Sequence, residues 1–506
     1  MLSVFDQGPP PICPSPFNLA AYALRRAAIT PNKPALEVIG GAQPDIWSYE
    51  RLRHCVLAIG TGLLASGLAP GDIILLRLGH SVDFPLSFLA AIAVGLVPVP
   101  TSAQLTAIET ETLLKDLEPA AILYDPSVPC PTNIRCRVIA LSELRQMRSL
   151  PVATFALGDP DRLAYGMYTS GTSGSPRAVE HAHRTIWARR MMRDGWHHLG
   201  DSDRLLHAGA FNWTYTLGTG LLDPWCCGAT AVIPEKLGDI AGLPDLLAAH
   251  NITVFAAAPG VFRKMVTGAD LPALPNLRHA LSAGEKLAPS LHTQWQRATG
   301  RPIYEAFGMS ECSTFISSCP QTTTPAESVG RPQTGRRVAI VDDKGPIDIG
   351  KQGMIAVSRH DQGLMIGYHN AVEVMGNRLV GEWFLTGDQG RMAQSGDITY
   401  CGRSDDMMTA GGYKISPIEV ETALQEHPDI TDVAVTELEI KPDVRVIVAF
   451  YTAAVGLDEP GLKHYAAARL ARYKQPRLYV HIPALPMGAN NKVLRRKLRD
   501  FYKATV

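Results

Sequence analysis

Short apolar strands alternate with helical segments over most of this chain, and this alternation constrains its fold more than any other feature. The expected helices lie at 17–28 and 87–95, and the expected strands at 72–78, 97–100, 229–233, 254–257 and 279–282. Such alternation is typical of an α/β domain built on a largely parallel sheet. We therefore expect α/β architecture for the main body of the chain.

The composition and hydrophobic pattern of the sequence change at about residue 330. Beyond this point glycine and aspartate become frequent, and the apolar segments are short and strand-like. The expected strands lie at 337–341, 354–358, 383–386 and 398–401. They predict a small β-barrel or sheet attached to the main body.

A second change falls at 402–406. About a hundred residues follow, with a helix beginning at Ser416, strands at 433–435 and 445–450, and a helix at 459–472. Ser416 is suited to the N-cap because Pro417 and Glu419 follow at the first and third helical positions. We expect a large N-terminal domain over 1–402 and a small α+β C-terminal domain over 403–506.

Length and charge exclude several classes of protein. A chain of 506 residues is too long for one ordinary core, and 46% hydrophobic with 19% charged residues is typical of a globular protein. The 48 basic residues are balanced by 48 acidic ones, so we expect no nucleic acid partner and no recruitment to anionic membranes. A local basic cluster at 492–499 reads, taken alone, as a solvated helix face.

Cysteine usage and the ends of the chain bear on location. The nine cysteines are scattered without C-x-x-C spacing, which favours a reducing compartment over a disulfide framework or a structural zinc site. The N-terminus shows no signal-peptide pattern, and the longest apolar stretch, 88–100, is too short to cross a bilayer. These features predict a cytoplasmic protein without a membrane span, and a homodimer is left open.

The segment 168–177 carries the strongest chemical signal. Five hydroxyl residues and two glycines fall between Thr169 and Ser175, directly after a short buried strand. Glycines let the backbone turn so that N–H groups converge, and hydroxyls add donors around the same point. The segment is suited to a nucleotide triphosphate but lacks the Walker pattern, and a Ser/Gly-rich surface loop remains the alternative.

Four more segments carry residues that are candidates for the same functional site. An aromatic platform and an acid at 304–311 can stack a purine and hold magnesium, or can form a strand end with a structural glutamate. Asp388, displayed at a strand end, can bind the paired hydroxyls of a ribose. The other two segments, 402–421 and 490–498, lie in the expected C-terminal domain.

These five segments, in this order and spacing, resemble the acyl-adenylate-forming superfamily of acyl-CoA synthetases, luciferases and peptide-synthetase adenylation domains. The resemblance covers essentially the whole chain and includes 67–72, 95–100 and 282–285. It implies that a carboxylate attacks the α-phosphate of ATP to give an acyl-AMP, and that a thiol then displaces AMP. ATP, Mg²⁺ and coenzyme A are the implied cofactors.

The resemblance also implies a role for each matching residue. The catalytic set would be Lys492, Glu311 and Thr172, with Glu311 and Thr172 placing Mg²⁺. Phe307 would lie on adenine, and Asp388 and Arg403 would hold the ribose. Contacts to ATP or coenzyme A would fall on Thr169, Ser170, Gly171, Thr172, Ser173, Gly174, Arg177, Gly284, Glu285, Phe307, Gly308, Ser310, Asp388, Arg403, Gly411 and Gly412.

In such enzymes the small domain swings about a hinge, here Asp405. The motion would withdraw Lys492 from the α-phosphate and bring Gly411 and Gly412 to the site, where bare backbone can line a pantetheine tunnel. Two departures from the family pattern stand out. Arg177 replaces the usual lysine of the phosphate loop, and asparagines at 490–491 replace the usual Ser-Gly.

The acid pocket is expected around 211–218, with Trp213, Tyr215 and Gly218 from that segment and with Gly308. The segment has no aspartate to pair with an amino acid and resembles the benzoate and medium-chain acyl-CoA ligase branches. Trp213 and Tyr215 would wall a small aryl or short-to-medium acyl acid, or they are simply core aromatics.

The expected thiol acceptor is free coenzyme A, because no carrier domain follows Lys492 in the given sequence. The expected activity is therefore that of an AMP-forming carboxylate–CoA ligase. Three alternatives stay open: a stand-alone enzyme that loads a separate carrier protein, a luciferase-type oxygenase, and a non-catalytic nucleotide-binding relative.

Overall fold

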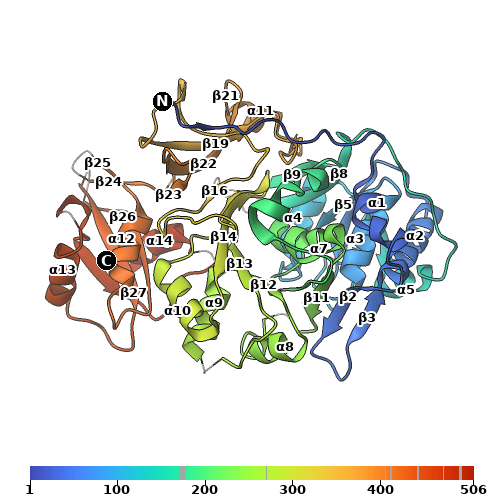
Figure 1. Ribbon diagram of the computed structural model, residues 1–506, viewed down its shortest axis with the longest axis horizontal. Helices are drawn as coiled ribbons and strands as arrows, with labels where there is room; N and C mark the ends of the chain where they lie inside the picture. The colour runs from blue at the N-terminus through green and yellow to red at the C-terminus, as the bar shows by residue number, and fades with distance from the viewer. Residues whose placement is uncertain are drawn as a thin grey trace.

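The computed structural model describes residues 1–506 apart from 170–176, 237, 269–270, 405, 411–412, 442–443, 471, 489–492 and 506. Figure 1 shows the blue-to-green N-terminal helices and sheets at one end of the molecule and the orange-to-red C-terminal unit at the other. Strands β19 (Gln352–Ser358) and β22 (Trp383–Met392) lie along the upper edge of the view.

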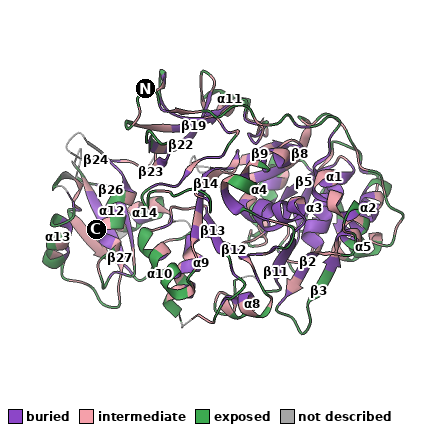
Figure 2. Cartoon of the chain, viewed as in Figure 1, coloured by how far each residue is buried: buried purple, intermediate pink, exposed green. Residues whose placement is uncertain are grey.

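A nine-stranded sheet forms the centre of the main body, in the order β16-β15-β14-β13-β12-β10-β11-β2-β3. Its strands are β2 (Pro34–Ile39), β3 (Asp45–Ser48), β10 (Arg204–His207), β11 (Thr230–Pro234), β12 (Val254–Ala257), β13 (His279–Ala283), β14 (Ile303–Met309), β15 (Ser313–Ser317) and β16 (Arg331–Pro332). The run from β14 to β2 is parallel, and β3, β15 and β16 are antiparallel. Every residue of β11, β12 and β13 is buried, as Figure 2 shows in purple. This confirms the expected parallel α/β body.

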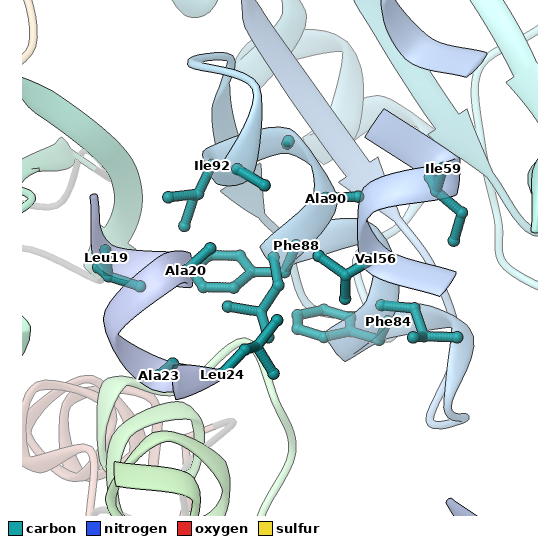
Figure 3. Packing of buried hydrophobic residues seen from close by; sticks show 14 of the residues in the cluster. Leu19, Ala20, Ala23, Leu24, Val56, Ile59, Phe84, Phe88, Ala90 and Ile92 are labelled. Carbon is teal, nitrogen blue, oxygen red and sulfur yellow. The ribbon is translucent and has the colours of Figure 1, made fainter. Parts of the chain in front are cut away.

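A second parallel sheet has the order β5-β4-β6-β7. Its strands are β4 (Ile73–Arg77), β5 (Val97–Pro100), β6 (Ala121–Tyr124) and β7 (Arg137–Ala140). The helices α1 (Leu19–Ala23), α2 (Tyr49–Ala65) and α3 (Asp83–Ala93) belong to the same part of the chain. Figure 3 shows their apolar side chains meeting in one core, where Leu24, directly after α1, lies with Val56 of α2 and with Phe84 and Phe88 of α3.

A small antiparallel sheet links the main body to the β-rich part. It consists of β8 (Leu163–Thr169), β9 (Arg177–Ala182) and β20 (Gly367–Tyr368), in the order β20-β9-β8. Because β20 comes almost two hundred residues after β9, this pairing could not be read from a local pattern.

The β-rich part is a seven-stranded antiparallel sheet, with β1-β17-β19-β22-β21 as its path and β18 and β23 paired at its sides. Its remaining strands are β1 (Val4–Phe5), β17 (Val338–Asp342), β18 (Gly345–Pro346), β21 (Leu379–Val380) and β23 (Ile398–Arg403). The change of composition and pattern near residue 330 predicted this unit. The N-terminal strand β1 joins it by pairing with β17, which the sequence did not indicate.

The C-terminal unit has its own sheet, β26 (Asp432–Lys441), β27 (Val444–Thr452) and β28 (Leu478–His481), and a hairpin of β24 (Met408–Ala410) and β25 (Tyr413–Ile415). Alternate residues of the sheet enter two separate cores, with Val435 and Ala449 in one and Ala434 and Val448 in the other. A sheet covered on both faces is suited to an independently folding unit.

The remaining helices complete the layers over these sheets. They are η1 (Arg25–Ala28), α4 (Ala107–Leu117), α5 (Leu141–Met147), α6 (Thr185–Ala188), η2 (Arg193–His197), η3 (Thr216–Leu222), α7 (Asp223–Cys227), α8 (Leu243–Ala249), α9 (Pro259–Gly268), α10 (Pro289–Thr299), α11 (Val372–Gly376), α12 (Pro417–Gln425), α13 (Glu459–Ala467), η4 (Arg472–Lys474) and α14 (Arg495–Thr505). Ser416 caps α12 as expected, since its hydroxyl accepts a hydrogen bond from the Glu419 N–H. Helix α13 ends five residues before the expected 472, because the chain must turn back to place β28 beside β27. Within the described residues, no helix is long and apolar enough to cross a membrane.

Candidate active site

The serine- and threonine-rich segment closes a β-hairpin. Strands β8 and β9 pair antiparallel, and their last registered pair joins Thr169 to Arg177. Antiparallel partners lie about 5 Å apart, so the ends of the segment are fixed side by side. The residues between them, which include Ser170, Gly171, Thr172, Ser173 and Gly174, lie outside the described residues, and their phosphate contacts stay a prediction.

Glu311 lies in the turn between β14 and β15 and is 8% exposed. Its Oε1 accepts hydrogen bonds from the Tyr368 hydroxyl at 2.6 Å and from Arg378 Nη1 at 3.2 Å. Tyr368 belongs to β20, which pairs with β9, so the carboxylate is tied to the hairpin that carries the phosphate segment. Burial and the neighbouring carboxylate raise the pKa of Tyr368, which therefore remains a donor at neutral pH. No local pattern marked Tyr368 or Arg378, because they lie 57 and 67 residues from Glu311.

A single buried carboxylate at this position fits a magnesium ion held mainly through phosphate. Mg²⁺ commonly takes one or two protein carboxylates and completes its octahedron with water and substrate phosphate oxygens. In the part of the chain that the structure describes, no three His, Cys, Asp or Glu residues gather as a metal cluster. The hydrogen bonds from Tyr368 and Arg378 both end on Oε1 of Glu311. This donor set suits a nucleotide-bound ion better than a metal bound by protein alone.

Asp388 and Arg403 face each other across β22 and β23, where they are register partners. Arg403 Nη1 donates to Asp388 Oδ2 at 3.1 Å, and the Tyr400 hydroxyl donates to Asp388 Oδ1 at 2.9 Å. The Phe307 ring, on the other sheet, lies 5.6 Å from the Tyr400 ring, centroid to centroid. An aromatic surface beside a carboxylate and a guanidinium is suited to a base and its ribose hydroxyls.

Tyr400 is a residue of the candidate site that the sequence did not reveal. Burial first, and the Asp388 carboxylate second, raise its pKa well above the usual range, so its hydroxyl stays protonated. The bulge in the β22–β23 register, between Gln389 and Gly390, separates the Asp388–Arg403 pair from Tyr400. Because strand alternation breaks at a bulge, no period-two pattern could have assigned Tyr400 to this face.

Trp213 lies against the turn that follows β13. Gly284 has φ +96°, and a Cβ added to it would come within 2.6 Å of the Trp213 indole, so only glycine fits this contact. The next residue, Glu285, is half-buried. Tyr215 lies behind Trp213, with ring centroids 5.1 Å apart, and its buried hydroxyl donates to the Leu281 carbonyl at 3.0 Å. Trp213 thus lies against the Gly284 turn, with Tyr215 buried behind it.

The two other glycines of the expected pocket also have no room for a side chain. A Cβ on Gly308 would come within 2.2 Å of the Ser313 carbonyl oxygen, and a Cβ on Gly218 within 2.4 Å of the Arg189 guanidinium. Gly218 lies in η3, a π-helical stretch in which the Asp223 N–H donates to the Gly218 carbonyl, five residues back. Such wide turns are frequent at functional sites. Ser310, two residues after Gly308, accepts a hydrogen bond from His181 Nε2 through its carbonyl.

The remaining predicted residues belong to the C-terminal part of the chain. Lys492, Asp405, Gly411 and Gly412 lie outside the described residues. The strands β24 and β25 pair Ala410 with Tyr413, so positions 411–412 connect the two arms of a hairpin.

Arg495, three residues after Lys492, is not part of a solvated face as its basic cluster suggested. Its Nη2 bonds both carboxylate oxygens of Glu421, at 2.7 and 2.9 Å, and its Nη1 lies 3.4 Å from Asp406. Its Nε donates to the Val435 carbonyl at 3.2 Å. The partners of Arg495 come from distant parts of the chain, so the local run of basic residues could not reveal them. Arg495 therefore ties the start of α14 to α12 and to the residue after the expected hinge.

The two largely parallel sheets, the β-rich unit and the groups around Asp388 and Glu311 are those expected of an adenylate-forming enzyme. Comparison with known proteins agrees. The family described as AMP-binding enzyme matches residues 24–369, and the AMP-binding enzyme C-terminal domain matches residues 419–492. The chain belongs to the AMP-binding enzyme family, in its acyl-CoA synthetase branch.

Individual relatives point the same way. A 4-hydroxybenzoate–CoA/benzoate–CoA ligase of Rhodopseudomonas palustris is 30% identical over 494 residues, which cover 90% of this chain and 88% of that protein. A mitochondrial acyl-coenzyme A synthetase of Rattus norvegicus is 28% identical over 92% of this chain and 86% of its own length. The crystal structure of a benzoate CoA ligase from Burkholderia xenovorans superimposes with a TM-score of 0.86 at 26% identity, over 96% of this chain and all of that one. These relatives confirm the expected reaction class and fold.

Proposed function

We propose that this protein is an AMP-forming carboxylate–CoA ligase that acts on a small aryl or short-to-medium acyl acid. The observation that carries the proposal is the cluster of Asp388, Arg403, Tyr400 and Phe307, together with the buried Glu311 carboxylate on the neighbouring hairpin. The relatives that cover most of the chain are ligases of benzoate and of acyl acids.

The chemistry proceeds in two displacements. An oxygen of the acid attacks the α-phosphorus of ATP, and the bond to the bridging oxygen breaks to release pyrophosphate. The sulfur of coenzyme A then attacks the acyl carbon, its proton is lost to solvent, and AMP leaves. Both steps bring anions together, so the site must supply positive charge and fixed donors.

Each residue of the proposed site has its own role in these two steps. Asp388 and Arg403 bind the ribose hydroxyls, and Phe307 supports the base. Lys492 neutralises charge between the incoming carboxylate and the α-phosphate, and the segment 170–176 binds the outer phosphates. Glu311, with Thr172, holds Mg²⁺, which when bound offsets phosphate charge. Trp213 and Gly308 border the acid, with Tyr215 and Gly218 behind them.

The division into domains and the hinge belong to the same proposal. The C-terminal unit, 403–506, carries Lys492 and turns about Asp405, so that Gly411 and Gly412 approach the site for the second step. Support comes from the separate cores on the two faces of its sheet and from Arg495, which joins the Lys492 end of α14 to Asp406.

An acid panel tests the proposal directly. Pyrophosphate release is measured with benzoic acid, ring-substituted benzoic acids and alkanoic acids of two to ten carbons, with and without coenzyme A. We expect ATP-dependent release with at least one acid and a thioester only when coenzyme A is present. Acyl-AMP formation without any thioester would instead favour a carrier-protein thiol as the acceptor. No release with any acid would contradict ligase activity.

A further inference from the structure

A small internal cavity lies between the expected acid segment and the turn that carries Glu311. Its volume is about 20 Å³, which is room for one water-sized group. Thr214 and Gly218 line it from the acid segment, Ser310 and Ser313 from the Glu311 turn, and His181 and Arg336 from the far side. The cavity therefore shares Gly218 with the expected acid pocket.

Arg336 lines this cavity and carries hydrogen-bond donors without acceptors. Its side chain is fully buried, and its Nη1 pairs with Asp361. Its Nε and Nη2 find no hydrogen-bond partner among the described residues. Leaving a buried donor unmatched costs about 1–3 kcal/mol, so the cavity favours a guest that accepts hydrogen bonds.

His181 brings an acceptor. Its Nε2 lies 2.9 Å from the Ser310 carbonyl oxygen, and a carbonyl only accepts, so Nε2 carries the proton. Burial lowers the pKa of His181 to about 4, which keeps the ring neutral at pH 7 and leaves Nδ1 as a lone-pair acceptor. Nδ1 has no partner in the described part of the chain. The ring is fixed by stacking on Tyr165, with centroids 4.8 Å apart.

The charges at the cavity are already balanced. Arg189 makes a two-point ion pair with Asp223, with both N···O distances 2.6 Å, and its Nη1 bonds the Ser313 hydroxyl. Arg336 is offset by Asp361. A second carboxylate on the substrate would place an uncompensated buried charge here, which is strongly unfavourable.

We propose that this cavity receives a hydroxyl group of the acid substrate, and that it selects a hydroxylated acid over its unsubstituted parent. The inference rests on the proposed ligase function. A hydroxyl can accept from Arg336 and donate to His181 Nδ1 at once. A methyl group can do neither, and a fluorine or a carboxylate has no proton to give to Nδ1. Sites built to bind a hydroxyl discriminate strongly against analogues that lack it.

The test compares acids that differ only in this group. Benzoic acid is compared with its hydroxy, fluoro and methyl derivatives at each ring position, and kcat/KM is measured by pyrophosphate release. We expect one hydroxy isomer to exceed its fluoro and methyl counterparts by about tenfold or more. His181→Gln, which can still donate to Ser310, and Arg336→Lys, which can still pair with Asp361, should each lower that ratio about tenfold.

A matched control is Arg331→Lys, because Arg331 makes a two-point ion pair with Asp397 outside the cavity; this variant should keep the ratio. Equal loss for hydroxylated and unsubstituted acids in both variants would mean that the cavity holds only a structural water, and the inference would be overturned. If a variant has a lower Tm than the wild type, the wild-type kcat/KM ratios alone test the inference. The absence of any preference for a hydroxylated acid in the wild type would also overturn the inference. A protein that forms no acyl-AMP with any acid would instead contradict the ligase function itself.

Discussion

At the scale of single residues, the proposed nucleotide site contains two carboxylates, each held by two hydrogen-bond donors. Asp388 is 5% exposed and receives hydrogen bonds from Tyr400 and Arg403. Glu311 is 8% exposed and receives them from Tyr368 and Arg378. Each carboxylate is thus oriented by one neutral and one charged donor, which fixes its position before ATP arrives. Preorganised groups of this kind need no rearrangement when the substrate binds.

Replacing Asp388 by Asn should weaken ATP binding without changing the choice of acid. A hydrogen bond to a charged group contributes about 1.5–3 kcal/mol, so the KM for ATP should rise about tenfold or more. Steady-state kinetics with ATP and the acid varied in turn measures both constants. Asp397→Asn is the control, because Asp397 is similarly buried at 4% exposure and pairs with Arg331. A change in the range of acids alone would contradict the placement of Asp388.

Glu311→Gln should raise the Mg²⁺ concentration required for half-maximal adenylation by about tenfold, equivalent to about 1.4 kcal/mol. Tyr368→Phe should act in the same direction and more weakly, because it leaves the carboxylate in place and removes only its 2.6 Å hydrogen bond. Titration of the adenylation rate with MgCl₂ measures both effects. If the Mg²⁺ dependence of Glu311→Gln matched that of the wild type, the metal would lie elsewhere.

At the scale of elements, α14 connects the Lys492 end of the chain to the rest of the C-terminal unit. Leu498 fills one core of the unit, while Arg495 and Arg499 both reach Asp406, at 3.4 and 3.7 Å. Arg499 Nε also donates to the Thr436 hydroxyl at 2.9 Å. A helix anchored by packing on one side and by ion pairs on the other moves together with the residues around it.

Glu421→Gln should destabilise the C-terminal unit, because it leaves the half-buried Arg495 guanidinium without its two-point partner. Hydrogen bonds to charged groups contribute about 1.5–3 kcal/mol, so a loss of this order is expected. Thermal unfolding should show a lower Tm, and adenylation should slow because Lys492 lies three residues before Arg495. The control is Glu439→Gln, because the side chain of its partner Arg445 is 63% exposed. This variant should leave Tm unchanged. An unchanged Tm for Glu421→Gln would show that this ion pair does not anchor α14.

At the scale of the whole molecule, an ion pair joins helix α9 of the main body to the C-terminal unit. Arg263 of α9 lies 2.7 Å from Asp432 at the start of β26, and the two side chains are 38% and 31% exposed. If the C-terminal unit turns between the two half-reactions, this contact exists in only one of its positions. The ion pair therefore reports on domain movement without touching either substrate.

Arg263→Gln should slow one half-reaction and spare the other. A partly exposed ion pair contributes about 0.2–1 kcal/mol, so the selective effect should be no more than about fivefold. Acyl-AMP formation and thioester formation from supplied acyl-AMP are measured separately by quenched flow. Lys463→Gln is the control, because its partner Glu459 belongs to the same helix. Equal slowing of both half-reactions would contradict the selective role.

The sequence predicted the parallel α/β body, the β-rich unit and the C-terminal unit, because each depends on local periodicity and on glycine-rich turns. It also indicated Asp388, Arg403 and Glu311, since each lies in a short segment typical of the family. It could not reveal Tyr368, Tyr400 or the pairing of β1 with β17, because these contacts join residues far apart in the chain or across a bulge. Arg495 was hidden for a different reason: a run of basic residues does not show which of them is buried.

The most direct test of the central claim follows the oxygen atoms of the acid. The enzyme is given ATP, coenzyme A and benzoic acid, or the best acid of the panel, labelled with ¹⁸O in both carboxylate oxygens, and the products are analysed by mass spectrometry. Attack of the carboxylate on the α-phosphorus predicts one ¹⁸O atom in AMP, one in the acyl-CoA and none in pyrophosphate. AMP without ¹⁸O, or label in inorganic phosphate or pyrophosphate, would contradict the acyl-adenylate route.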